Sequence, residues 1–171
     1  TISFADLEPE LQQIAMAIPG EHSARPRAGM KCLTLMGSAG LDPGWNSRHT
    51  SARHRVIPLP SPAAVERLPM VSRLISELGM SVANLVEAAT DPLLQPEVGH
   101  ARVFHVEEAQ GSPFIPDQED FVRRYGIRSV VGFGSSLQSG DLWAVILFTR
   151  LSVNVEVARL FRMLATDIKI A

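Results

Sequence analysis

The stretch Tyr125-Gly-Ile-Arg-Ser-Val-Val-Gly-Phe-Gly-Ser-Ser-Leu-Gln-Ser-Gly-Asp-Leu-Trp-Ala-Val-Ile-Leu-Phe-Thr-Arg150 decides the fold of this chain. Two apolar runs rich in β-branched residues flank the polar segment 137–141, where Gly140 can supply the positive φ of a tight turn. The pattern therefore predicts a β-hairpin. Because residues 142–148 are apolar at every position, we expect this second strand in the middle of a sheet, with no face in solvent.

Apolar stripes at helical spacing predict a helix near each end of the chain. The stripes consist of Leu7, Leu11, Ile14 and Ile18, and of Val157, Phe161, Leu164, Ile168 and Ala171. Asn154 is placed to cap the last helix, and Pro19-Gly20 to close the first. We expect two more helices, one over 71–78 ended by Gly79 and one starting at Asp117, whose side chain can cap free amides.

Strands are expected outside the hairpin as well. They cover 30–36, 55–60 and 102–106, and Pro58 makes the second of these an edge strand because proline lacks the ladder donor. The segment 81–86 fits either a strand or a helix, and 90–102 reads as a loop. Antiparallel strands with helices kept apart from them are typical of an α+β fold.

The composition excludes several classes of protein. With 16 basic and 18 acidic residues the net charge is −2, so no global field attracts nucleic acid or a membrane surface. No apolar run is long enough to cross a bilayer, and no secretory leader is visible. The single Cys32 excludes an internal disulfide framework and is consistent with a cytoplasmic location. A first residue other than Met suggests a fragment of a longer protein.

Side chains that could carry chemistry do not form a catalytic or metal-binding motif. The pairs His49 and His54, and His100 and His105, are five residues apart, a spacing that suits neither a helix face nor a strand face, so we expect no metal site. The basic cluster at 48–55 is interpreted as a solvated loop, with an anionic effector or an acidic partner domain as the alternative. No serine stands in a G-x-S-x-G setting.

Several blocks of the sequence resemble GAF-like sensor domains of bacterial signalling proteins, which stand upstream of histidine kinases, cyclases or phosphatases. The blocks are 104–122, 125–134 and 140–148, together with Leu41-Asp-Pro-Gly-Trp-Asn46 and the segment 54–62. The resemblance covers residues 30–171, so residues 1–29 would form a separate N-terminal helix and linker. It implies a central antiparallel sheet of about six strands, helices on one face, and long N- and C-terminal helices.

The same resemblance implies a ligand pocket on the other face of the sheet, without naming its ligand or cofactor. The residues assigned to this pocket are Phe104, His105, Tyr125, Arg128, Phe133 and Trp143. The Asn-Lys-Phe-Asp-Glu signature of the branch that binds cyclic nucleotides is absent. Which face of the strand 142–148 lines the pocket stays open.

The terminal stripes repeat with a period of 3.5, which suits a seam between helices. We therefore expect a homodimer through Leu7, Leu11, Ile14, Ile18, Val157, Phe161, Leu164 and Ile168. Together these features predict a non-catalytic input domain that acts on a downstream signalling domain. The alternatives are a structural dimerisation module without a ligand and a small-molecule hydrolase.

Overall fold

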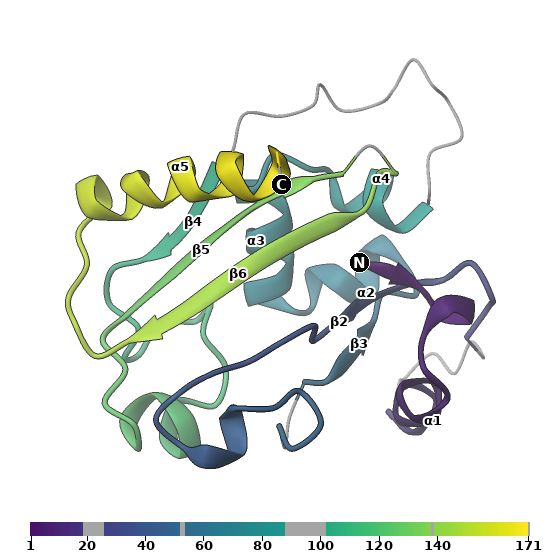
Figure 1. Ribbon diagram of the computed structural model, residues 1–171, viewed down its shortest axis with the longest axis horizontal. Coiled ribbons are helices and arrows are strands. Elements are labelled where there is room, and N and C mark those ends of the chain that lie inside the picture. The colour runs from purple at the N-terminus through teal and green to yellow at the C-terminus, as the bar shows by residue number, and fades with distance from the viewer. Residues whose placement is uncertain (19–25, 52–53, 88–101, 138, 171) are drawn as a thin grey trace. The chain divides into compact units, whose positions relative to one another are not determined.

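The computed structural model describes residues 1–18, 26–51, 54–87, 102–137 and 139–170 (Figure 1). The chain divides into two compact units, residues 1–62 and 63–171. The division expected at residues 29 and 30 is not observed, because strand β1 (Ile2–Ser3) pairs with β2 (Lys31–Thr34) inside the first unit. The loop expected at 90–102 lies outside the described residues, except for its last residue.

The first unit contains a three-stranded antiparallel sheet in the order β1-β2-β3, with β3 at Val56–Pro58. Cys32 is the partner of Ile2 on one side and of Pro58 on the other, so β2 is central and Pro58 is on an edge, as predicted. Two short 3₁₀ helices lie between these strands in the sequence, η1 (Phe4–Asp6) after β1 and η2 (Pro43–Trp45) after β2.

Helix α1 (Pro9–Ala17) confirms the predicted first helix, although it begins two residues later than its stripe. Pro9 suits the first helical position, where its missing N–H costs no hydrogen bond. Leu11 and Ala15 are buried with Leu7 and Cys32 in one apolar cluster. The stripe therefore packs on the unit's own sheet.

The second unit contains most of the helices and the predicted hairpin. Its helices are α2 (Pro62–Glu66, starting at the last residue of the first unit), α3 (Pro69–Glu77), α4 (Val82–Glu87), the π-helix η4 (Gln118–Arg123) and α5 (Val155–Ile170). Its strands β4 (Arg102–Val106), β5 (Ser129–Ser136) and β6 (Leu142–Thr149) form an antiparallel sheet in the order β4-β5-β6.

The hairpin is confirmed, but the positions of its strands in the sheet differ from the prediction. Ser129 pairs with Thr149 and Ser136 with Leu142, and Gly140 has a φ of +79°. The central strand is β5, which is buried at all eight positions. β6 is an edge strand of this sheet, with Phe148 37% exposed, so apolar composition alone was a wrong guide to its position.

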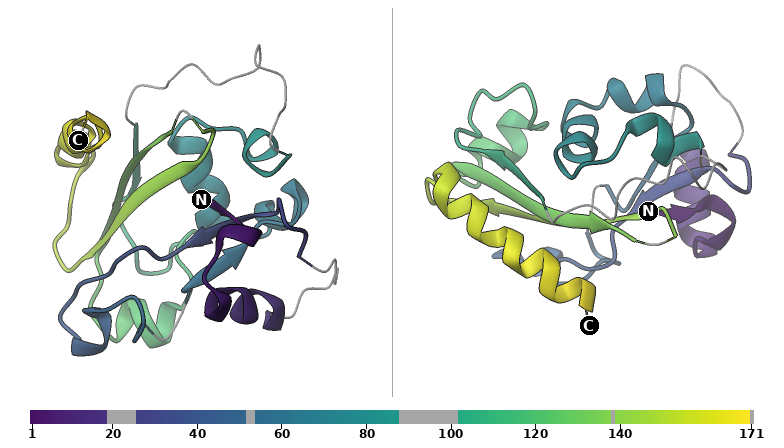
Figure 2. Two further views of the ribbon diagram at one scale, coloured as in Figure 1. Left: turned by 45° about the vertical axis from the view of Figure 1, so that its right-hand side comes forward. Right: turned by 90° about the horizontal axis from the view of Figure 1, so that it is seen from above.

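Helices cover both faces of this second sheet. Figure 2 shows α5 along one face and α3 on the other, which gives three layers within the unit. The α+β class is therefore correct. Within the described residues, a single six-stranded sheet with helices on one face and long terminal helices is not observed: each unit has a sheet of three strands, and α1 has nine residues.

Of the predicted ends of α3 and η4 in the second unit, the glycine stop is confirmed and the Asp117 side-chain cap is not. Gly79 ends α3 with a φ of +87°, as expected, and all of the ambiguous segment 81–86 except Ser81 is helical in α4. Asp117 does not cap η4 with its side chain. Its own φ is +55°, and its carbonyl oxygen accepts from Phe121 N at 3.0 Å.

Candidate functional site

Helix α5 begins at the cap that the sequence predicts. Asn154 Oδ1 accepts a hydrogen bond from Val157 N at 2.9 Å, and Asn154 O accepts from Ala158 N at 3.0 Å. Glu156 in the first turn adds a negative charge where the helix dipole is positive. The start of α5 is thus set by local chemistry.

The face of α5 toward the sheet is narrow. Ala158 and Ala165 are fully buried, and the Phe161 ring lies 5.8 Å from the Phe133 ring of β5. Burial of two alanines and one half-buried phenylalanine stabilises this contact by only about 3 kcal/mol. Few apolar groups therefore hold a helix of 16 residues on its sheet.

A second apolar face of α5 is exposed. Val157, Leu160, Leu164 and Ile168 are 45%, 63%, 45% and 50% exposed. Their spacings of three, four and four residues place them in one stripe along the helix, beside the buried stripe. Met163, 68% exposed, extends this surface. We call Val157, Leu160, Leu164 and Ile168 the α5 stripe.

The residue before the cap is held by two hydrogen bonds from the sheet. His105 Nε2 lies 2.7 Å from the carbonyl oxygen of Val153. Because a carbonyl oxygen only accepts, Nε2 carries the hydrogen in this contact. The Val153 N–H donates to Ser129 Oγ at 2.9 Å, and that hydroxyl donates to Glu107 O at 2.8 Å. Both polar groups of the Val153 backbone are thereby fixed to the sheet.

The backbone of His105 is bonded on its other side to α3. Arg73 and Glu77 form an ion pair in which Arg73 Nε lies 2.7 Å from Glu77 Oε1. The His105 N–H donates to Glu77 Oε2 at 3.2 Å, and the His105 carbonyl oxygen accepts from Arg73 Nη2 at 3.1 Å. The ion pair thus satisfies an N–H and a C=O of the edge strand β4, as a neighbouring strand would.

Aromatic rings hold Arg73 in this position. Its guanidinium carbon lies 4.2 Å from the centre of the Phe114 ring and 5.6 Å from that of Phe104. Such contacts favour a fixed guanidinium over a mobile one. The i, i+4 spacing of Arg73 and Glu77 was the only sequence signal for this pair, and it does not reveal the bonds to β4.

The six residues predicted to line a pocket do not come together. His105, Phe133 and Trp143 share the face of the sheet that carries α5, with the Phe133 and Trp143 rings 6.5 Å apart. Phe104 is fully buried on the opposite face, against Leu74 and Gly132. Tyr125 and Arg128 precede β5, beside the sheet. Core packing accounts for Phe104 and Phe133, because neither ring is accessible to a ligand.

The predicted dimer residues also divide into two groups. Leu7 and Leu11 are core residues of the first unit, and Ile14 packs against that core, so they are not available for an interface. Ile18 is 44% exposed. On α5 the residues Val157, Leu164 and Ile168 are exposed, whereas Phe161 faces the sheet. Leu160, which the heptad pattern did not include, completes the exposed stripe.

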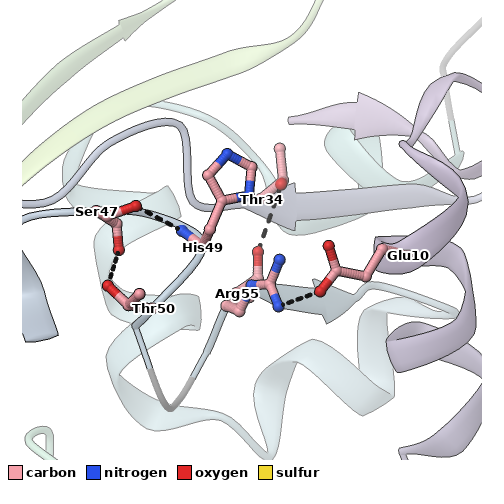
Figure 3. A network of polar contacts seen from close by, with 6 residues as sticks. All are labelled: Glu10, Thr34, Ser47, His49, Thr50 and Arg55. Atoms are coloured by element: carbon pink, nitrogen blue, oxygen red, sulfur yellow. Dashed lines mark hydrogen bonds and ion pairs between the residues drawn. The ribbon is translucent and has the colours of Figure 1, made fainter.

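The basic segment 48–55 is joined to α1 by ion pairs. Arg48 Nη2 lies 2.6 Å from Oε1 of Glu8, the residue before the helix. Arg55 Nη1 lies 2.7 Å from Glu10 Oε1 (Figure 3). The hydrogen bond from Arg55 lowers the pKa of Glu10 below its usual value. The Arg55 carbonyl accepts from Thr34 Oγ1 at 3.4 Å. Two carboxylates thus pair with two of the three arginines of the segment, and the third, Arg53, lies outside the described residues.

Neither a metal centre nor a membrane span is found in the part of the chain that the structure describes. There, no group of three or more His, Cys, Asp or Glu residues is placed to hold a metal ion. None of the described helices is long and apolar enough to cross a bilayer. Comparisons with family models, with curated proteins and with solved structures give no match to this chain.

Proposed function

We propose that this chain is a non-catalytic regulatory input module of a cytoplasmic signalling protein, and that α5 is its output element. The observation that carries the proposal is the α5 stripe, whose side chains are 45–63% exposed beside the narrow face through which the helix packs on the sheet. The resemblance of residues 104–122, 125–134 and 140–148 to GAF-like sensor domains supports the same role.

The α5 stripe has the properties of a surface that another helix covers. Contiguous exposed apolar side chains are unfavourable in water and mark interaction sites. Spacings of three and four residues match the seam of a two-stranded helical pair. A second copy of this chain presents an identical stripe, so the two would be complementary about a two-fold axis. Formation or rotation of this helical pair is the proposed output.

The oligomeric state of the purified chain tests this proposal. We expect a dimer by light scattering, and a monomer for the double variant Leu160→Asp with Leu164→Asp, because two charges would be buried in the seam. The control is Arg162→Ala with Thr166→Asp, which makes the same change of net charge on the polar side of α5 and should leave the dimer intact. Circular dichroism checks that each variant is folded. A wild type that stays monomeric would exclude self-association.

A ligand-free dimerisation module is the second candidate. The observation in its favour is that Phe104 and Phe133, both expected in a pocket, are packed in the core and buried to 0% and 5% exposure. Native mass spectrometry separates the two roles. Co-purified mass on the chain supports the sensory module, and a bare dimer supports the structural one.

A further inference from the structure

We propose that His105 couples helix α3 to helix α5, so that the state of the Arg73–Glu77 ion pair sets how firmly the start of α5 is held. The proposal rests on the output role of α5 and adds its regulation. One residue makes both sets of contacts: the His105 ring bonds to Val153 O, and the His105 backbone bonds to Arg73 and Glu77.

The first step is that the bonds at Val153 matter for α5. The helix contacts its sheet through Ala158, Phe161 and Ala165, of which only Phe161 has a large side chain. A helix held by so few apolar groups depends on the anchor at its start. The Val153 backbone is hydrogen-bonded at both N–H and C=O, and Ser129, which accepts the N–H, is fully buried.

The second step is that the position of His105 depends on α3. β4 is an edge strand of the described sheet, in which only β5 pairs with it. Glu77 and Arg73 supply those bonds at 3.2 Å and 3.1 Å. If either side chain turns away, the edge of β4 loses its partners at this residue, and the His105 ring loses the fixed backbone that aims it at Val153.

The third step is that the ion pair is accessible. The side chains of Arg73 and Glu77 are 30% and 31% exposed, in contrast to the buried Ser129. A molecule or partner surface that binds either charge would compete with the bonds to β4. The change would then reach α5 through a single residue, which gives a contiguous physical route between two helices on opposite faces of one sheet.

Hydrogen–deuterium exchange of the full chain tests this coupling. His105→Leu removes the ring N–H. We expect the amides of 155–170 to exchange about five- to tenfold faster, which corresponds to the loss of about one hydrogen bond that holds the start of α5. His105→Gln is the matched variant, because its side-chain amide can donate to Val153 O, and it should stay close to wild type. Equal exchange in α5 for the Leu and Gln variants would overturn the role of the ring.

A second set of variants tests the contribution of α3. Glu77→Ala removes the bond to His105 N and should also speed amide exchange in α5, to which the proposed coupling links Glu77 only through His105. Its control is Glu119→Ala, which breaks the exposed i, i+4 pair with Arg123 in the same unit and should leave α5 unchanged. In the double variant Glu77→Ala with His105→Leu, the two effects should be less than additive. Wild-type exchange in α5 for Glu77→Ala, with β4 exchanging faster, would refute the coupling.

The exchange measurements on the His105 variants are repeated in a chain that also carries Leu160→Asp and Leu164→Asp. This experiment separates the coupling from the proposed dimer. The contacts of His105 lie within one chain, so the difference between the Leu and Gln variants should persist in a monomer. Its disappearance there would show that α5 is held by its partner helix and not by His105.

Discussion

The ring of Phe161 on α5 lies 5.8 Å from the ring of Phe133 on β5, and the two rings are inclined by 34°. Phe133 in turn meets Trp143 edge-on at 6.5 Å. The three rings link α5 to both strands of the hairpin. Phe161 is therefore the large side chain through which α5 contacts the hairpin.

Replacing Phe161 by alanine should release α5 from the sheet. Because the ring is half-buried, we expect the free energy of unfolding to fall by about 2–3 kcal/mol, below the value for a fully buried ring. Urea denaturation measures this change. The control Met163→Ala removes a side chain that is 68% exposed and should change stability by less than about 0.5 kcal/mol. Equal effects of the two variants would contradict the packing described for α5.

Gly134 of β5 should not tolerate a side chain. An added Cβ would meet the carbonyl oxygen of Trp143 and would lie 2.9 Å from the Ala144 Cα, both backbone atoms of the paired strand. We expect Gly134→Ala to cost about 2 kcal/mol or more, since the strands must separate. Gly37→Ala, where nothing lies within 4 Å, should be neutral or slightly stabilising. Thermal unfolding of the two variants checks the contrast.

The Cys32 thiol should be unreactive until the first unit unfolds. It is fully buried in β2, and burial raises its pKa to about 11. At pH 8 the thiolate is therefore scarce and inaccessible. We expect slow labelling by a disulfide reagent in buffer and fast labelling in denaturant. Rapid labelling of the native chain would argue against this burial.

The same pKa shift predicts how stability depends on alkaline pH. A folded-state pKa above the ordinary value of 9.0 stabilises the chain below pH 9, and this contribution is lost as the pH rises toward 11. The wild type should therefore lose stability over this interval more steeply than Cys32→Ala. Urea denaturation of both proteins at pH 8 and at pH 10.5 would show the difference. An equal loss of unfolding free energy between the two pH values in wild type and variant would exclude it.

Acid should weaken the attachment of α1. The pKa of Glu10 is lowered by the hydrogen bond from Arg55, so its contribution is present above the ordinary carboxyl value of 4.5 and is lost as pH falls through the lower folded value. Glu10→Gln should reduce the Tm at pH 7 and have a smaller effect at acid pH. The exposed Glu108→Gln should have little effect at either pH. A constant effect of Glu10→Gln across pH would exclude the ion pair as its cause.

Local chemistry explains which parts of this fold could be predicted from the sequence. The strand 102–106, the hairpin with Gly140, the cap at Asn154 and the stop at Gly79 depend on nearby residues, and the structure confirms each. The order of strands in a sheet, in contrast, depends on contacts between segments that are distant in the sequence. An apolar edge strand and an apolar central strand have the same composition, so 142–148 gave no sign that β5 would be the central strand.

The candidate site could be predicted only in part. The apolar character of α5 was visible in the sequence. Which of its side chains pack and which are exposed depends on the surface of the sheet. Phe161 was therefore assigned to the interface although it packs on the sheet, and Leu160 was left out although it is exposed. The bonds of His105 join residues 28, 32 and 48 positions apart. No spacing rule reports such contacts, because tertiary structure alone brings them together.

The ion pair on the edge of β4 has a consequence for assembly. A bare edge is a template on which a foreign chain can add a strand, the first event in fibril growth. Charged side chains from α3 occupy the outward-facing donor and acceptor of His105, so an added strand would have to displace them at this residue. The side chains of Arg73 and Glu77 thus also serve as a guard against polymerisation from that side of the sheet.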